Sequence, residues 1–404
     1  TRVWISGVCT AVALTCAVSA AVETPPPASG EVVRLNNLVW QLPVTQKSGE
    51  GSVEAAVKVT GGGWTFVEFT APVQAMELKC GDRKAADAAQ LVEAREFMVD
   101  LAAGDYTLSA KALFADPAHK LEVKRVHRIP EIYYYAPAIV GGLEVLDGNQ
   151  FWKSIGGQLL QSTNLLAPGA LTKEELALYR QAGRKVFFNV MSKPVSDGEI
   201  DQFVTSVQPR LDLPEWDGFT VDEFNFGDPK EYARYAEALG KIKNPDGKRM
   251  YTWSYGVKYN DKPAQLDFVR LSMNPPSGKG RLMTEVYLET KETEAEAEAF
   301  IRKRIVEDAA SILSQLPGLA SGYGIVPGNF NAMPILTQET VPEADYKYYL
   351  DRQLYVIAND PACRDLGLVG YWGGNYCQED MQRWCLALLR HYFVEGKKEM
   401  LSER

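Results

Sequence analysis

The feature that most constrains this sequence is a change of rhythm near Pro130. Beyond it, short apolar runs of strand length alternate with longer helical stretches, which is the pattern of βα units and a parallel sheet. Eight such units occupy about 250 residues in a typical barrel, and about 270 residues follow Pro130. We therefore expect residues 131–404 to form a (β/α)8 barrel of the TIM type.

The expected strands and helices of this barrel can be placed by their patterns. Strands are predicted at residues 157–162, 185–190, 218–223, 249–255, 281–287, 322–326 and 367–372, and an eighth at either 132–136 or 268–273. Helices are predicted over residues 173–182, 230–243, 292–315, 344–358 and 379–393. A doubly wound open sheet is the alternative, but no GxGxxG or GxxxxGK[ST] segment follows a strand, so nucleotide binding has no support.

The part before the barrel divides into three segments. Residues 1–20 read as a signal peptide, because Arg2 precedes a short apolar run and small residues end at Ala20, and residues 21–30 read as a Pro-rich linker. A retained anchor and a lipid on Cys16 are the alternatives. Residues 31–130 contain alternating runs at 53–59, 64–69, 96–101 and 106–112, which predict an antiparallel β-sandwich serving as an accessory domain that packs on the barrel or binds glycan.

The net charge and the cysteines indicate the cellular compartment of the protein and the kinds of partner it has. The net charge of -9 argues against nucleic acid as a partner, and no later apolar run is long enough to span a membrane once the signal is removed. We expect an exported protein, periplasmic or extracellular. Its mature part keeps Cys80, Cys363, Cys377 and Cys385, of which Cys363 and Cys377 are the favoured disulfide pair and buried free thiols are the equal alternative. The sequence does not indicate the oligomeric state.

Carboxylates at predicted strand ends are the strongest functional signal, because the active site of such a barrel lies at the carboxyl ends of its strands. Asp222 and Glu223 directly follow an apolar run, and adjacent strand residues normally face opposite ways. Glu285 stands inside another apolar strand. A capped or salt-bridged loop pair is the alternative for Asp222 and Glu223, and an internal salt bridge to an arginine such as Arg281 is the alternative for Glu285. Two facing carboxyls are what acid/base chemistry on a glycosidic bond requires.

Other predicted strand ends carry aromatic and amide side chains of the kinds that stack on sugars and hydrogen-bond their hydroxyl groups. Each alone is better explained by packing, and their coincidence is the evidence. The chain has three histidines and no CxxC pair, which disfavours a metal site, a cofactor or a histidine-based triad. The candidate substrate-binding residues are Asn189, Trp253, Tyr255, Tyr287, Asn329, Trp372, Asn375 and Tyr376.

The segment from Asp217 to Glu223 resembles the strand-four motif of chitinase-type glycoside hydrolases, in which DG precedes alternating acids and a catalytic Glu. That motif has an acid where this chain has Thr220 and its Glu where this chain has Phe224. Residues 60–404 also look like a group of uncharacterised exported bacterial proteins with a β-sandwich before a barrel. The latter resemblance rests on residues 221–224, Glu285 and the closing stretch 370–396.

These observations predict a glycoside hydrolase acting on an extracellular polysaccharide or glycan. Glu223 or Asp222 is the expected proton donor, and Glu285 the expected nucleophile, base or stabiliser. Retention of the anomeric configuration is weakly favoured. A non-catalytic carbohydrate-binding protein and a polysaccharide lyase are the rival hypotheses, although acidic substrates usually call for basic groups and these strand ends are acid-rich.

Overall fold

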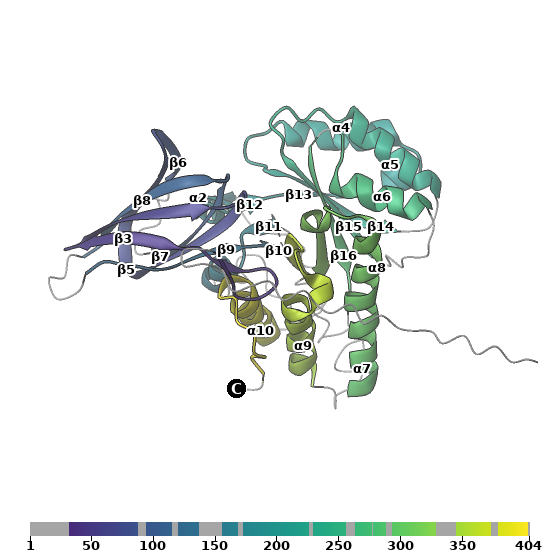
Figure 1. Ribbon diagram of the computed structural model, residues 1–404. Coiled ribbons are helices and arrows are strands. Elements are labelled where there is room, and N and C mark those ends of the chain that lie inside the picture. The colour runs from purple at the N-terminus through teal and green to yellow at the C-terminus, as the bar shows by residue number, and fades with distance from the viewer. Residues whose placement is uncertain are drawn as a thin grey trace, which may run out of the picture.

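The computed structural model of the chain comprises a β-sandwich followed by a parallel barrel wrapped by helices (Figure 1). It describes residues 32–87, 94–114, 120–136, 156–168, 173–225, 229–255, 263–276, 278–287, 293–328, 345–372 and 379–402. The predicted signal peptide and the linker at 21–30 lie outside these residues.

The sandwich is a strongly bent antiparallel sheet organised around one long strand, β5 (Gly63–Cys80). The first half of β5 pairs with β7 and β9, and its second half pairs with β6 and β8. Strand β4 alternates strictly between exposed and buried residues, so one face of the sheet packs on the sandwich core. The other strands are β1 (Val33–Arg34), β2 (Trp40–Gln41), β3 (Val44–Gly49), β4 (Ser52–Val59), β6 (Arg83–Asp87), β7 (Ala94–Leu101), β8 (Gly104–Ala112) and β9 (Val123–Ile129).

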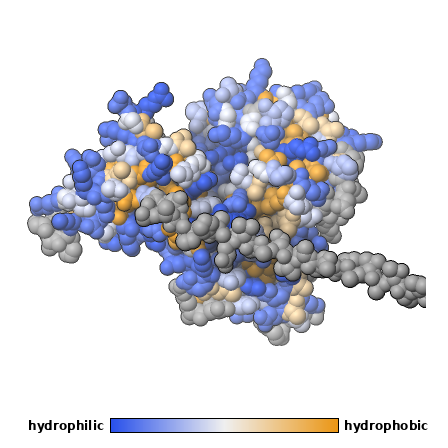
Figure 2. Space-filling view, in the orientation of Figure 1, coloured by the Kyte–Doolittle hydropathy of each residue, from blue (hydrophilic) through white to orange (hydrophobic). Residues whose placement is uncertain are grey.

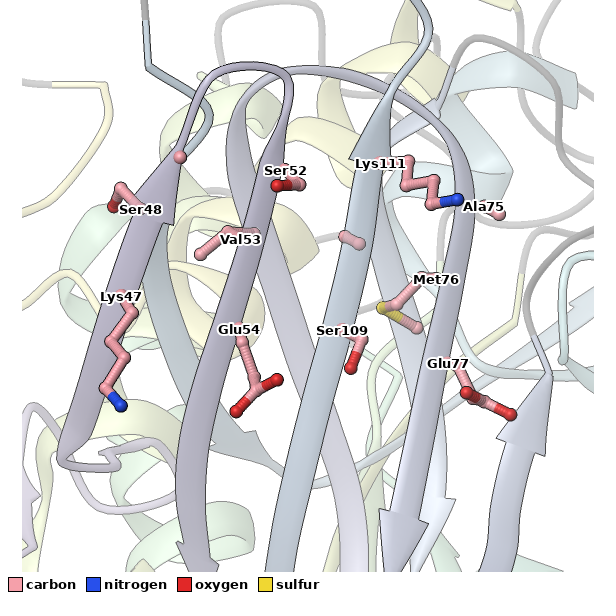
Figure 3. Close-up of a pocket in the computed structure, with 12 residues that line it drawn as sticks. Lys47, Ser48, Ser52, Val53, Glu54, Ala75, Met76, Glu77, Ser109 and Lys111 are labelled. Atoms are coloured by element: carbon pink, nitrogen blue, oxygen red, sulfur yellow. The ribbon is translucent and has the colours of Figure 1, made fainter.

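The outer face of the sandwich has a shallow hollow of about 600 Å³ over strands β3, β4, β8 and β5 (Figure 3). Lys47, Glu54, Ser109 and Glu77 lie in register across these four strands. The described residues that line the hollow include no aromatic side chain. These lining residues therefore offer no stacking surface of the kind with which proteins commonly hold sugars.

The second sheet is a closed eight-stranded barrel. Nine strand segments fill eight positions, because β12 and β13 are two halves of one strand interrupted at Phe187, with β12 paired to β11 and β13 paired to β14. All pairings are parallel, as expected. The strands are β10 (Glu131–Ala136), β11 (Leu165–Pro168), β12 (Lys185–Val186), β13 (Phe188–Met191), β14 (Gly218–Asn225), β15 (Arg249–Tyr255), β16 (Lys279–Glu285), β17 (Tyr323–Val326) and β18 (Leu368–Trp372).

Helices surround the barrel (Figure 1). The expected helices are all present, and those at 292–315 and 379–393 each include a π-helical turn. The helices are α2 (Lys173–Gln181), α3 (Lys193–Ser196), α4 (Ile200–Leu211), α5 (Pro229–Lys241), α6 (Pro263–Met273), α7 (Glu294–Ile301), η1 (Arg302–Glu307), α8 (Asp308–Gln315), η2 (Ala320–Gly322), α9 (Tyr346–Asn359), η4 (Pro361–Cys363), α10 (Glu379–Leu389) and η5 (Arg390–Val394).

One strand prediction was wrong, and one of the two options for the eighth strand is excluded. Residues 157–162 are helical, and the Thr163 N–H donates to the Leu159 carbonyl four residues earlier, because a short apolar run does not by itself distinguish helix from strand. Residues 268–273 lie in α6, where the buried side chains follow helical spacing. The eighth strand is the other option, 132–136, and the strand at Leu165–Pro168 was not predicted.

The prediction that Cys363 and Cys377 form a disulfide was also wrong. Cys363 and Cys385 are buried free thiols and Cys80 is a partly buried one, while Cys377 lies outside the described residues. Burial raises the pKa of the Cys363 thiol. The alternative of buried free thiols fits Cys363 and Cys385.

On the face of the molecule shown in Figure 2, hydrophilic residues predominate and apolar patches are scattered. Within the described ranges, no helix has the length and apolarity needed to cross a membrane.

The barrel core continues into the sandwich. Leu38, Trp64, Phe66 and Met98 of the sandwich belong to the same apolar cluster as the barrel side chains. The Arg184 guanidinium donates to the Met98 carbonyl at 3.1 Å. The sandwich thus closes the amino-terminal end of the barrel and leaves the carboxyl end available for a site.

Candidate active site

The described part of the candidate site lies at the carboxyl ends of the barrel strands. Asp222 and Glu223 come from β14, and Glu285 is the last residue of β16, two strands away. Negative charge on Asp222 and on Glu223 acts on Glu285, so the three carboxyl groups form one electrostatic cluster. The structure thus brings together the three acids singled out in the sequence.

The backbone explains how two adjacent acids serve one site. A register shift interrupts the β14–β15 pairing between Val221 and Phe224, and Glu223 has a φ of 54°, in the left-handed region. Such a conformation is uncommon for a residue other than glycine and breaks the strand alternation on which opposite orientations depend. Regular strand alternation therefore does not apply at Asp222 and Glu223, and the negative charge of both residues acts on Glu285.

Two hydrogen bonds hold this strained residue. The Ser192 hydroxyl donates to the Glu223 carbonyl at 2.8 Å, and the Glu223 N–H donates to Asp222 Oδ1 at 3.0 Å. Strained backbone persists where its surroundings over-determine it, and such positions concentrate at functional sites. Ser192 was missed because a serine after a strand carries no specific signal.

Asp222 is a partly buried carboxyl group. The Tyr135 hydroxyl donates to its Oδ2 at 3.2 Å. Burial, and then repulsion from Glu223, raise the pKa of Asp222 to about 6, while the hydrogen bonds from Tyr135 and from the Glu223 backbone lower it. Tyr135, at the end of β10, was also missed, although the run of three tyrosines on a candidate strand could have drawn attention to it.

Glu285 is more deeply buried, with 8% of its surface exposed. Burial raises its pKa well above the usual range, repulsion from Asp222 and Glu223 adds to this, and a hydrogen bond with Tyr287 opposes it. The alternative of a salt bridge to Arg281 is wrong, because Arg281 ion-pairs with Glu131 at 2.9 Å at the other end of the barrel. No described cation forms an ion pair with Glu285, and a buried acid of this kind is a candidate for proton transfer.

Of the aromatic candidates, Trp253 belongs to the barrel core, whereas Tyr287 and Trp372 lie at the site. Trp253 is 1% exposed and packs against Tyr135, with ring centroids 5.4 Å apart, so it supports the site from inside the barrel. Tyr287 and Trp372 are partly exposed and their rings lie 5.7 Å apart. This pair is the better candidate for contact with a sugar.

The remaining substrate-binding candidates are the residues other than Trp253, Tyr287 and Trp372. Asn189 is the second residue of β13 and not its end. Burial and then Asp222 raise the pKa of the Tyr135 hydroxyl group, and a hydrogen bond with Asn189 lowers it. The backbone of Tyr255 pairs with that of Glu285. Asn329, Asn375 and Tyr376 lie outside the described residues. Within the described ranges, no group of three or more His, Cys, Asp or Glu residues could hold a metal ion.

Comparison with known proteins gives structural likenesses only. No family model matches the sequence, and no curated protein matches it. Among solved structures, β-glucuronidase from Bifidobacterium dentium with coumarin-3-O-glucuronide has a TM-score of 0.43 and 9% identity, covering 88% of this chain and 66% of that one. Faecalibacterium prausnitzii β-glucuronidase gives 0.41 and 10%, with coverages of 89% and 66%. The apo β-glucuronidase of Ruminococcus gnavus gives 0.37 and 11%, with coverages of 83% and 61%. The chain thus spans less than two thirds of the length of these structures, and its chemistry has to be inferred from its own residues.

Proposed function

We propose that the protein is a glycoside hydrolase in which Asp222, Glu223 and Glu285 supply the acid and base groups. The observation that carries this proposal is the clustering of the three carboxyls at the carboxyl end of a barrel, with burial and mutual repulsion raising the pKa of two of them. Hydrolysis of a glycosidic bond needs one carboxyl that is protonated and one that is ionised at the same pH.

The surroundings support a division of labour between Asp222 and Glu285. Glu285 is the more buried and is the better candidate for the group that stays protonated near neutral pH. Asp222 accepts two hydrogen bonds that favour its ionised form, so it is the better candidate for base or nucleophile. This reverses the roles expected from the sequence, in which Asp222 or Glu223 donates the proton.

The substrate side of the proposal rests on Tyr287 and Trp372. Their partly exposed rings belong to the same cluster as Glu285, through the hydrogen bond between Tyr287 and Glu285. Aromatic faces of this kind pack on the apolar face of a sugar ring. The same pair would serve a carbohydrate-binding protein without catalysis, which is the rival hypothesis.

Turnover on a panel of polysaccharides and aryl glycosides tests the proposal. We expect the wild-type protein to release reducing ends from at least one neutral glycan, and Glu285→Gln and Asp222→Asn to lose this activity while still binding that glycan. Binding without hydrolysis by the wild-type protein would favour the rival. Export of the protein is part of the same proposal, and N-terminal sequencing of secreted material should place the mature start near residue 21.

A further inference from the structure

A cavity of about 690 Å³ lies between the sandwich and the amino-terminal end of the barrel. Its volume is in the range of about 300 to 1,000 Å³ that is usual for small-molecule sites. Glu131, Arg249 and Lys279 line it at the first residues of three barrel strands, and Trp40 and Arg128 line it from the sandwich. It is therefore at the opposite end of the barrel from Asp222 and Glu285.

Positive charge is concentrated around this cavity, although the whole chain carries a net charge of -9. Counting the charged side chains that line the cavity and their direct ion-pair partners gives seven cations and three carboxylates. The cations are Arg34, Arg128, Lys185, Arg249, Lys279, Arg281 and Arg364, and the carboxylates are Asp100, Glu131 and Asp365.

The three carboxylates are already engaged. Glu131 is buried and pairs with both Arg249 and Arg281 at 2.9 Å. Asp100 pairs with Lys185 and, at 3.0 Å, with Arg249. Asp365 pairs with Arg34 at 2.6 Å. All three carboxylates therefore form ion pairs with cations other than Arg128 and Lys279.

Arg128 and Lys279 form no ion pair with any described residue. The Arg128 guanidinium lies 5.2 Å from the centroid of the Trp40 ring, on which Arg34 also lies at 4.6 Å. Burial lowers the pKa of Arg128 and the neighbouring charge of Arg34 lowers it further, while the charge of Asp365 opposes this in part. An anion placed in the cavity would relieve this repulsion.

We propose that this interdomain cavity binds a small, multiply charged oxyanion through Arg128 and Lys279. Phosphate, sulfate and clustered carboxylates share the chemistry that a guanidinium recognises with paired N–H donors. Arg128 belongs to the sandwich and Lys279 to the barrel, so the ligand stabilises the contact between the two parts. The site does not depend on the glycosidase proposal.

Inorganic phosphate is the probe, with sodium chloride at equal ionic strength as the reference. Calorimetric titration and thermal unfolding should show saturable binding of phosphate and a rise in the unfolding temperature that chloride does not reproduce. In Arg128→Gln/Lys279→Gln the affinity should fall at least about tenfold, because each substitution removes a charge-assisted hydrogen bond to the oxyanion. Sulfate and citrate titrations then show which oxyanion geometry is preferred.

Lys47→Gln/Lys58→Gln is the matched control, because it removes the same charge from the outer face of the sandwich. It should bind phosphate as the wild type does, and so should Asp222→Asn. Lys279→Gln alone, a change at an exposed side chain, provides a second test if the double variant does not fold. Equal phosphate binding by the cavity variants and the control, or an effect of ionic strength alone, would overturn the proposal.

Discussion

Replacing Asp222 by Asn should stabilise the protein at neutral pH. The pKa of Asp222 is about 6 in the folded protein, against a reference of 3.8. At about 1.4 kcal/mol per pH unit, keeping this group ionised costs the folded state about 3 kcal/mol above pH 6. Asn removes that cost but keeps only one oxygen to accept the hydrogen bonds from Tyr135 and Glu223, a loss of about 1 kcal/mol. The expected net gain is about 2 kcal/mol.

The sign of the pH dependence makes this prediction specific. Because the folded pKa is raised, the wild type loses stability as the pH rises from about 4 to about 6, and the advantage of Asp222→Asn should grow over that range and vanish below it. Urea unfolding of both proteins between pH 4 and pH 8 measures the difference. Asp246→Asn, at an exposed turn, is the control and should change little. A destabilised Asp222→Asn protein at pH 7, or a difference independent of pH, would refute the electrostatic argument.

Three further predictions concern the same site. Glu285→Gln should lower kcat by about a hundredfold or more without unfolding the protein, because a positioned proton donor contributes that much, and near-normal turnover would exclude the role. Tyr135→Phe should move the acidic limb of the kcat profile to higher pH, since the hydroxyl group holds the pKa of Asp222 down, and an unchanged limb would contradict this. Glu223→Gly should raise the free energy of unfolding, measured in urea, by about 1 kcal/mol, because glycine adopts a φ of 54° without strain. A loss of stability would show instead that contacts of the Glu223 side chain offset the strain.

The elements that the sequence predicted well are those with long or repeated patterns. Strands such as Arg249–Tyr255 alternate with amphipathic helices such as α5, and their number limited the domain to a barrel. The wrong strand at residues 157–162 and the excluded option at 268–273 fell on short apolar runs, for which burial on one side of a helix and burial in a sheet give the same local composition. Tertiary contacts decide such cases.

The sequence singled out the three acids that cluster in the candidate site and missed the residues that support them. Asp222, Glu223 and Glu285 were recognisable because carboxylates rarely occur in apolar strands without a role. Ser192 and Tyr135 act through a carbonyl and a carboxylate that are distant in the sequence, and no local pattern reports such contacts. The orientation of Glu223 depends on a bulge, which the regular alternation of a strand cannot reveal.

The interior of the barrel connects the sandwich to the proposed active site. At the amino-terminal end, Glu131 accepts a hydrogen bond from the Tyr251 hydroxyl at 2.8 Å. The Tyr251 ring packs on Tyr133, whose hydroxyl hydrogen-bonds Thr220 on β14, two residues before Asp222. Interiors are close-packed, so a change in one layer is transmitted to the next. The ion pairs of Glu131 with Arg249 and Arg281 anchor the end of this stack, and Asp100 of the sandwich pairs with the same Arg249, so contacts run without a gap from the sandwich to the strand that carries Asp222.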